Sequence, residues 1–450
     1  MLFRSVVSYV AFCIVCSVLA FRRHPIWGFY FYLATTFVYP PARWWGYLLP
    51  DLRWALLSAA ITTLAVLFNR GKLNAKPPWI GSAPAVLLSL YAALMWLQTP
   101  WALAMDDHLE GSTFFVKSLF AFWLVYRLVD SKERVRDLSL AIVLGCGLLG
   151  VFAQATGREG GRLDGVGGPN LNDSNTLGMY LVTGIILAIG LVLTQSGWRR
   201  YVSLASLLLM AQGFILANSR GALVGLLAGS ATLALCKAKR HRWMFWSFAL
   251  VGAIGLAMLV DRVFIERMLT IQDVTSESED ADPSARSRVE IAKAQIEMFL
   301  DHPMGTGHRG TAALSRQYLD QRWLTSEDQG GERASHNTFL TTLVEQGVVG
   351  AAIYAGLVLW VLSAIWRVRR LQKRDDDPEL ITLGAALCSA LVVVFAAGIS
   401  ADFLIKEIQF WFYGLLVSVL QMSEARIAVE TTRDSTQSLR PMATQAPRTG

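Results

Sequence analysis

Thirteen long apolar runs follow one another along this chain of 450 residues and limit what it can fold into. Runs of roughly 17–25 apolar residues are long enough to cross a bilayer as helices. Only 17% of the residues are charged, whereas soluble domains carry about 25%, and charges at the bilayer centre are costly. We therefore predict an all-α polytopic membrane protein with 12–13 transmembrane helices, where the lower number applies if the short second run does not cross. The expected spans are Leu2–Ala20, Ile26–Tyr39, Trp54–Phe68, Ala83–Leu97, Thr113–Val129, Leu138–Ala155, Thr176–Thr194, Tyr201–Ala217, Ala222–Cys236, Trp243–Val260, Thr341–Trp366, Ile381–Gly398 and Leu404–Met422.

The loops between these runs differ in charge. Basic residues fill every second loop, and basic loops lie on the cytoplasmic side of a membrane. Thr99–Ser112 holds three acids and no Lys or Arg, so we place it outside. The alternation then places Gln154–Asn175, Ala217–Gly221 and a long later insert outside as well. The net charge of +7 follows from topology, and no nucleic-acid partner is expected. The basic sets are Arg70, Lys72 and Lys76; Arg127, Lys132, Arg134 and Arg136; Arg199 and Arg200; Lys237, Lys239, Arg240 and Arg242; and Arg367, Arg369, Arg370, Lys373 and Arg374.

The later insert, Asp261–Asn337, is the polar part of the chain. It holds nine of the 41 Lys and Arg, fourteen of the 34 Asp and Glu, and three of the six histidines. We predict four regions: an N-terminal transmembrane bundle (1–260), an external loop with short helices that carries the site (261–337), C-terminal transmembrane helices (338–422) and a disordered cytoplasmic tail (423–450).

The five cysteines do not indicate a disulfide framework. All lie in or beside apolar runs, and none lies in the insert. Cys13 and Cys16 have the C-x-x-C spacing but sit inside the first run, where they are expected to be packing residues.

Asn218-Ser219-Arg220-Gly221 forms a tight external loop between two spans, so Arg220 should begin the next helix. An arginine at a helix N-terminus adds its donors to the unpaired backbone amides and suits a phosphate. The alternative is an arginine that reaches lipid headgroups. Gly221, Gly225 and Gly229 are spaced by four and predict a smooth helix face for close packing.

Ser284–Leu300 is predicted to form an amphipathic helix that rests on the outer membrane surface. Arg286 and Arg288 lie near its start, where each could meet an anion or be an ordinary solvated charge. The apolar stripe consists of Val289, Ala292, Ile296, Phe299 and Leu300.

Residues 301–310 follow this helix, which should end before Pro303. The glycines among them predict a tight turn with His308 and Arg309 on it. The turn could bind an anion through its amides, although Gly-rich turns usually only reverse the chain. His302 and His308 have no neighbouring Cys and no H-E-x-x-H pattern, so no zinc site is predicted.

His336-Asn337 marks the return to the membrane. A histidine at this boundary can be neutral and accept a proton from a hydroxyl, or it can be merely structural. Asn337 or Ser335 should cap the next helix.

The external loop Gly167–Asn175 could bind sugar hydroxyls through Asn175, with Arg162 just before it. A turn followed by a helix cap explains the same residues. Asp106-Asp107-His108 and the acidic run near Glu279 could instead hold a divalent cation.

Together these motifs resemble the O-antigen ligase and polysaccharide polymerase superfamily. The matching elements are Ser219-Arg220-Gly221-Ala222, Arg288 followed by His302-Pro303-x-Gly305-x-Gly307, His336-Asn337-x-x-Leu340-x-x-Leu343-x-Glu345-x-Gly347, and Asp173-x-Asn175-x-Leu177-Gly178. Tyr39-Pro40 and Trp45-Gly46 look like the O-glycosylation ligases associated with exosortase systems.

The resemblance implies a GT-C-type glycosyltransferase in the bacterial inner (cytoplasmic) membrane, with its site on the periplasmic face. It implies transfer of a glycan from a polyprenyl diphosphate carrier to a lipid, glycan or protein acceptor, with inversion and without a metal or other cofactor. His336 then matches the catalytic histidine, and Arg220 and Arg288 match arginines that engage the diphosphate. Arg286, Arg309, Asn337, Asn175 and Arg162 are further candidates for substrate binding.

Two alternatives share the donor site: a polysaccharide polymerase and a protein O-oligosaccharyltransferase. An alternative of a different class, a polysaccharide transporter or flippase, would need ionisable residues midway along several spans and broken helices.

Overall fold

The computed structural model describes residues 2–158, 163–168, 171–259, 265, 283–324, 331–374 and 377–438. Within this part of the chain the regular structure is helical, and each of the thirteen predicted spans coincides with a helix. The corresponding helices are α1 (Leu2–Arg22), α2 (Ile26–Val38), α3 (Trp54–Phe68), α4 (Ala83–Leu97), α5 (Met105–Leu128), α6 (Lys132–Thr156), α7 (Ser174–Thr194), α8 (Gly197–Ala217), α9 (Arg220–Cys236), α10 (Arg242–Leu259), α14 (Thr338–Arg374), α15 (Pro378–Ala397) and α16 (Glu407–Ser438). The insert contributes α12 (Pro283–Asp301) and α13 (Gly310–Tyr318).

Length and composition confirm a polytopic membrane protein. Six of the described helices, α1, α6, α7, α8, α14 and α15, are long and apolar enough to cross a bilayer. Three further apolar helices, α3, α4 and α9, are shorter. The total of 12–13 crossings stays a prediction.

The centre of the bundle is built around α7 and α15, whose apolar stretches are almost entirely buried. The glycines of α9 form the predicted smooth face, and α15 packs against it. A Cβ atom added at Gly225 would lie 3.0 Å from the Val393 carbonyl oxygen, and one added at Gly229 would lie 3.1 Å from that of Ser389. This close packing fixes the start of α9, and therefore Arg220, against the end of α15.

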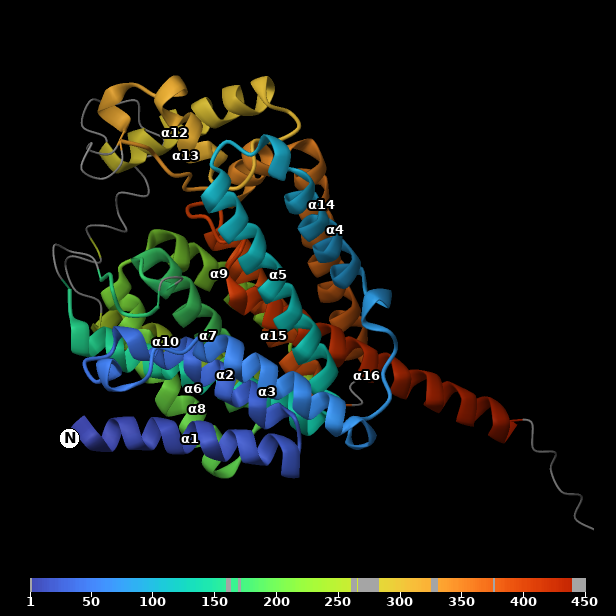
Figure 1. Ribbon diagram of the computed structural model, residues 1–450. Helices are drawn as coiled ribbons and strands as arrows, with labels where there is room; N and C mark the ends of the chain where they lie inside the picture. Colours follow the sequence, from blue (N-terminus) through green and yellow to red (C-terminus); the bar gives the residue numbers. More distant parts are fainter. Residues whose placement is uncertain are drawn as a thin grey trace, which may run out of the picture.

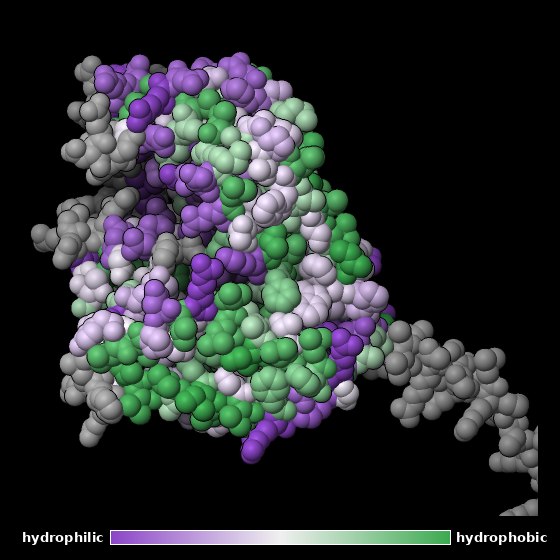
Figure 2. All heavy atoms as spheres, viewed as in Figure 1, coloured by the Kyte–Doolittle hydropathy of each residue, from purple (hydrophilic) through white to green (hydrophobic). Residues whose placement is uncertain are grey.

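A second group of helices flanks this centre. In Figure 1, α4, α5 and α14 stand side by side, and α12 and α13 lie above their ends. Helix α12 packs against α13 and α14, and α14 against α4 and α15. Figure 2 shows this face hollowed beneath α12 and α13, with hydrophilic residues around the hollow and hydrophobic residues over α1 and α2 below it.

The basic loops meet at one end of the bundle, as the charge alternation predicts. Lys76 Nζ donates to the Val129 carbonyl at 2.9 Å, and Lys132 Nζ contacts the Asp377 carboxylate at 2.8 Å. The Gln372 amide donates to the Lys237 carbonyl. These contacts place four of the basic loops together. The side of the membrane on which they lie stays a prediction.

We expect cysteine labelling to establish this sidedness. The five native cysteines are buried, so a new cysteine at an exposed position should dominate labelling. Gln321→Cys in the insert should react with a membrane-impermeant maleimide added to intact cells. Arg240→Cys at the basic end should react only after the cells are opened. The reverse result would place the insert in the cytoplasm.

The end of the chain differs from expectation. The tail was predicted to be disordered from residue 423, but α16 continues to Ser438. Polar contacts support this extension, because the Glu424 carboxylate pairs with Arg367 and the Arg426 guanidinium pairs with Asp377. The disorder prediction is therefore wrong for residues 423–438, and residues 439–450 lie outside the described part.

Candidate active site

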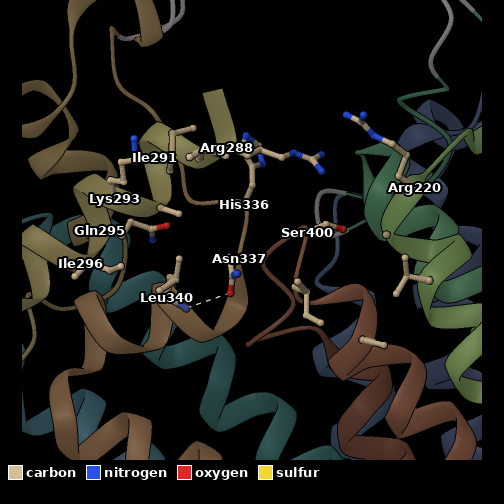
Figure 3. A pocket seen from close by; sticks show the side chains of 16 residues that line it. Arg220, Arg288, Ile291, Lys293, Gln295, Ile296, His336, Asn337, Leu340 and Ser400 are labelled. Atoms are coloured by element: carbon tan, nitrogen blue, oxygen red, sulfur yellow. Dashed lines mark hydrogen bonds between the residues drawn. The ribbon is translucent and has the colours of Figure 1, made fainter. Parts of the chain in front are cut away.

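A cavity of ≈ 540 Å³ lies where α9, α12, the start of α14 and the end of α15 meet. Most of its wall is apolar, but Arg220, Arg288, Lys293 and His336 also line it. Figure 3 shows Arg220 and Arg288 projecting toward one another from α9 and α12, with His336 beside Arg288. No Asp or Glu of the described residues lines this cavity, so it suits an amphiphile with an anionic head.

Arg220 is held at the start of α9, as predicted. Asn218 adopts the left-handed conformation (φ 51°) and ends α8, and the Ser219 hydroxyl accepts from the Ala222 amide as the cap of α9. The same hydroxyl donates to Asn175 Oδ1 at 3.0 Å. Arg220 is only 7% exposed. Its guanidinium therefore sits in a shielded wall rather than among lipid headgroups.

Arg288 comes from α12, whose existence and end before Pro303 are confirmed. The helix begins at Pro283, so Arg288 lies in the second turn and not at the N-terminus. The buried face of α12 is formed by Ile291, Ala294 and Met298, the last two packing with Leu314 of α13. Much of the predicted apolar stripe faces elsewhere: Val289, Ala292 and Ile296 line the cavity. We assign these three residues to the cavity wall, and contact of the stripe with the membrane surface stays a prediction.

His336 is fixed because both of its neighbours are anchored. Gln295 of α12 donates to the Ser335 hydroxyl at 2.8 Å. Asn337 Oδ1 caps α14 by accepting from the amides of Phe339 and Leu340 at 2.9 and 3.2 Å, which confirms the predicted cap. The next amide, of Thr338, donates to the Gly398 carbonyl at 2.7 Å. Helix α12, helix α14 and the loop after α15 therefore set the place of His336 together.

A second cavity of ≈ 610 Å³ lies beyond His336, and its wall is more polar than that of the first. Its wall includes the start of α7, the turn at Arg309 and the loop at Asp402. His336 lines both cavities, and no other described residue does. The structure thus separates the predicted residues into two sets: Arg220, Arg288 and Asn337 border the first cavity, and Asn175 and Arg309 border the second.

The Gly-rich turn was considered as an anion-binding nest, and that interpretation is wrong for most of its amides. The Thr306 and Gly307 amides donate to the carbonyls of Val344 and Glu345 at 3.1 and 2.9 Å. The Gly305 amide donates to His302 and the His308 amide to His108 Nδ1. The turn instead docks into a break in α14, where Gly347 has φ 67° and ψ −168° and the Val348 amide donates to the Pro303 carbonyl at 3.0 Å.

We expect Gly347→Ala to destabilise the protein. This backbone region is almost exclusive to glycine, and strain there costs about 1–3 kcal/mol. The added Cβ would also lie 2.5 Å from the Pro303 carbonyl oxygen. Thermal unfolding of the purified protein should show a lower midpoint. Gly356→Ala, in the same helix, is the matched control, because its Cβ would meet only the Leu87 side chain at 3.3 Å or more. An equal midpoint for the two variants would contradict the strain at Gly347.

The break brings together a buried polar cluster that the sequence reasoning did not assign. His308 Nδ1 lies 3.1 Å from Glu345 Oε2, and both side chains are nearly buried. His108 Nδ1 accepts from the His308 amide, so its Nε2 carries the proton and donates to the Met95 carbonyl at 2.9 Å. The sequence held one indication of this cluster, because Glu345 is the single acid in the apolar run Thr341–Trp366 and acids within membrane spans are often functional.

The protonation of His308 depends on the charge of Glu345. Burial would lower the pKa of His308, but the hydrogen bond and charge of Glu345 outweigh it and raise the pKa above its usual value. The ion pair is thus complete below the ordinary pKa of histidine and is lost as pH rises through the raised value. Burial, then the charge of Glu345, raises the pKa of Asp402 in the loop after α15.

The remaining predicted residues contribute less. Arg162, the side chain of Arg286 and the acidic run 277–282 lie outside the described residues. Asp107 faces a cation, since Arg309 Nε lies 3.8 Å from its carboxylate. Among the described residues no group of three or more His, Cys, Asp and Glu is placed to hold a metal ion.

The fold and site define the class: a helical multi-pass membrane protein with an arginine-bearing cavity and a polar cavity at one end of its bundle. Comparison with known proteins gives a more particular result. Residues 205–355, about a third of the chain, match the family model described as O-antigen ligase. The match spans Arg220, Arg288 and His336 and supports similarity to the O-antigen ligase and polymerase superfamily, while the exosortase-associated subtype stays a prediction. No curated protein matches the chain.

Proposed function

We propose that this chain is an inverting glycosyltransferase that moves a glycan from a polyprenyl diphosphate carrier to an acceptor hydroxyl. One observation carries the proposal: His336 lies at the junction between a cavity suited to a lipid diphosphate and a cavity suited to a hydroxyl-rich molecule. The similarity of residues 205–355 to O-antigen ligases favours the same reaction type.

In this reaction His336 takes the proton from the acceptor hydroxyl. The acceptor oxygen forms a bond to the anomeric carbon, and the bond from that carbon to the diphosphate oxygen breaks. The leaving diphosphate keeps the electron pair, and Arg220 and Arg288 stabilise its charge. Donors aimed at developing charge in a shielded site are strong contributors to catalysis. Attack from the side opposite the diphosphate inverts the anomeric centre.

We further propose that the arginines take the place of a metal ion. Guanidinium groups bind phosphate through paired hydrogen bonds. Transfer by the purified protein should therefore persist in EDTA at a rate within about twofold of the untreated rate. A twofold change corresponds to less than about 0.5 kcal/mol in the activation free energy. Loss of transfer in EDTA, with recovery on adding Mg²⁺ or Mn²⁺, would contradict this and favour the acids at Asp106 and Asp107.

The proposal places the protein in the bacterial inner membrane, with both cavities on the periplasmic face and a GT-C-type architecture. The acceptor can be a lipid, a glycan or a protein. Polymerases and protein O-oligosaccharyltransferases of the superfamily would use the same donor cavity and the same histidine.

A transporter remains the alternative of a different class, because α14 is broken and carries the buried Glu345. The break lies near the start of the helix, however, and the docked turn occupies the carbonyls there. Transporter helices break near the bilayer midplane, where the freed groups bind substrate. The position of this break therefore favours an enzyme.

Gene deletion with analysis of lipid-linked glycans tests the proposal. One surface glycan or glycoprotein should disappear, while its lipid-linked precursor accumulates on the external leaflet, accessible to a membrane-impermeant probe. Complementation with the native gene should reverse both changes. Accumulation on the cytoplasmic leaflet would identify a transporter and refute the enzyme.

A further inference from the structure

The polar cavity beyond His336 has hydrogen-bonding groups that no part of the described protein uses. The Asp164 carboxylate accepts from the Ser174 amide through Oδ1, and the Asp402 carboxylate accepts from the Leu404 amide through Oδ1. The Oδ2 atom of each has no hydrogen bond within the described residues. Asn175 Oδ1 accepts from Ser219, while its amide nitrogen has no bond within the described residues. The exposed side chain of Asn172 likewise has none there.

These groups suit a molecule rich in hydroxyls. Carboxylate oxygens accept, and amide groups both donate and accept, which matches the paired donor and acceptor character of a sugar hydroxyl. The cavity of ≈ 610 Å³ is within the range that holds small organic ligands.

The charges of the two cavities are opposite. Arg220 and Arg288 line the first, where Lys293 is paired with Glu290, whereas Asp164, Asp173 and Asp402 line the second. Arg309 and His308 also line it, but each faces an acid, Asp107 and Glu345 respectively. A phosphate or carboxylate group would meet unfavourable charge there, and an uncharged or amino sugar would not.

We propose that this second cavity is the acceptor site and that it takes a sugar residue without negative charge, one hydroxyl of which points to His336. This inference rests on the proposed function. It assigns Asn172, Asp164 and Asp402 to acceptor binding, and it makes the accepting group a carbohydrate rather than a serine or threonine of a protein.

Ligand-observed NMR with the purified protein in nanodiscs tests this site without relying on activity. The probes are methyl glycosides of several neutral hexoses, glucosamine, glucose 6-phosphate, methyl glucuronide and a short Ser/Thr peptide. With undecaprenyl diphosphate added to occupy the arginine-lined cavity, we expect saturation transfer to at least one neutral or amino sugar, and none to the two anionic sugars or the peptide. Binding of the anionic sugars or the peptide in preference to the others would overturn the proposal, as would binding of none.

Two variants locate the binding. Asn172→Ala is a change at an exposed side chain, and Asp402→Asn keeps shape while removing charge. Asp402→Asn should weaken sugar binding about tenfold or more, because it removes a hydrogen bond to a charged acceptor, and Asn172→Ala should weaken it about two- to tenfold, because it removes a neutral amide partner. Asp320→Asn, an exposed acid paired with Arg322 and outside both cavities, is the matched control. Unchanged sugar binding in both cavity variants would refute the site.

Binding of undecaprenyl diphosphate, measured on the same samples, separates this proposal from the proposed function. The carrier should bind the native protein and both cavity variants equally. If it fails to bind the native protein while a sugar binds and responds to the variants, the sugar site stands and the donor assignment falls. If the carrier binds and no sugar does, only the acceptor site is refuted.

Discussion

His336→Ala should reduce single-turnover transfer by about 100- to 10,000-fold, the range for loss of a general base, while binding of the lipid-linked donor changes little. The reason is position: His336 borders both cavities, whereas the charged groups suited to the diphosphate are Arg220 and Arg288. The measurement is transfer from purified lipid-linked donor, with donor binding determined separately at matched protein concentration.

The control for this change is His302→Ala. His302 lies in the same insert, just after α12, and lines neither cavity. Its loss should leave transfer nearly unchanged. Near-normal turnover of the His336→Ala protein would show that this histidine is only a structural residue before α14.

Arg220→Ala should impair both donor binding and transfer, and we expect turnover to fall about 100- to 1,000-fold, as when one preorganised donor to a developing charge is removed. The start of α9 is fixed by the Ser219 cap and by close packing on α15, so the guanidinium is preorganised. Arg220→Lys should recover only part of the loss, because an ammonium cannot form the paired hydrogen bonds of a guanidinium. Arg288→Ala should behave like Arg220→Ala.

Arg322→Ala serves as the control here. Its guanidinium pairs with Asp320 on the exposed insert and lines neither cavity. Full donor binding by the Arg220→Ala protein would contradict the diphosphate assignment, and full recovery by lysine would show that simple charge is sufficient.

Much of this fold follows from local features of the sequence. Apolar runs predicted the helices, and the Asn218–Gly221 loop predicted where α9 begins, because turn and cap preferences depend on a few adjacent residues. The glycine face of α9 and the cap at Asn337 were predicted for the same reason. The motif residues were found individually, but whether they share a cavity depends on tertiary packing.

Long-range docking was not predictable. The Gly-rich turn and Glu345 are about 40 residues apart, and their backbone bonds form only because α14 breaks at Gly347. The sequence suggested an uninterrupted span there, since glycine is tolerated within membrane helices. The buried face of α12 was not predicted, because two apolar stripes on one helix cannot be told apart until the partner surface is known.

The docked turn also limits how the protein can move during a catalytic cycle. Lifting the turn from α14 would remove the turn's bonds to the Val344 and Glu345 carbonyls and leave that of Val344 without them, and a buried group left unpaired costs roughly 1–3 kcal/mol. The second half of α12, the turn and the head of α14 should therefore move as one rigid body. Opening of the arginine-lined cavity would then depend on its other wall, where Val224 and Ile399 carry exposed apolar side chains.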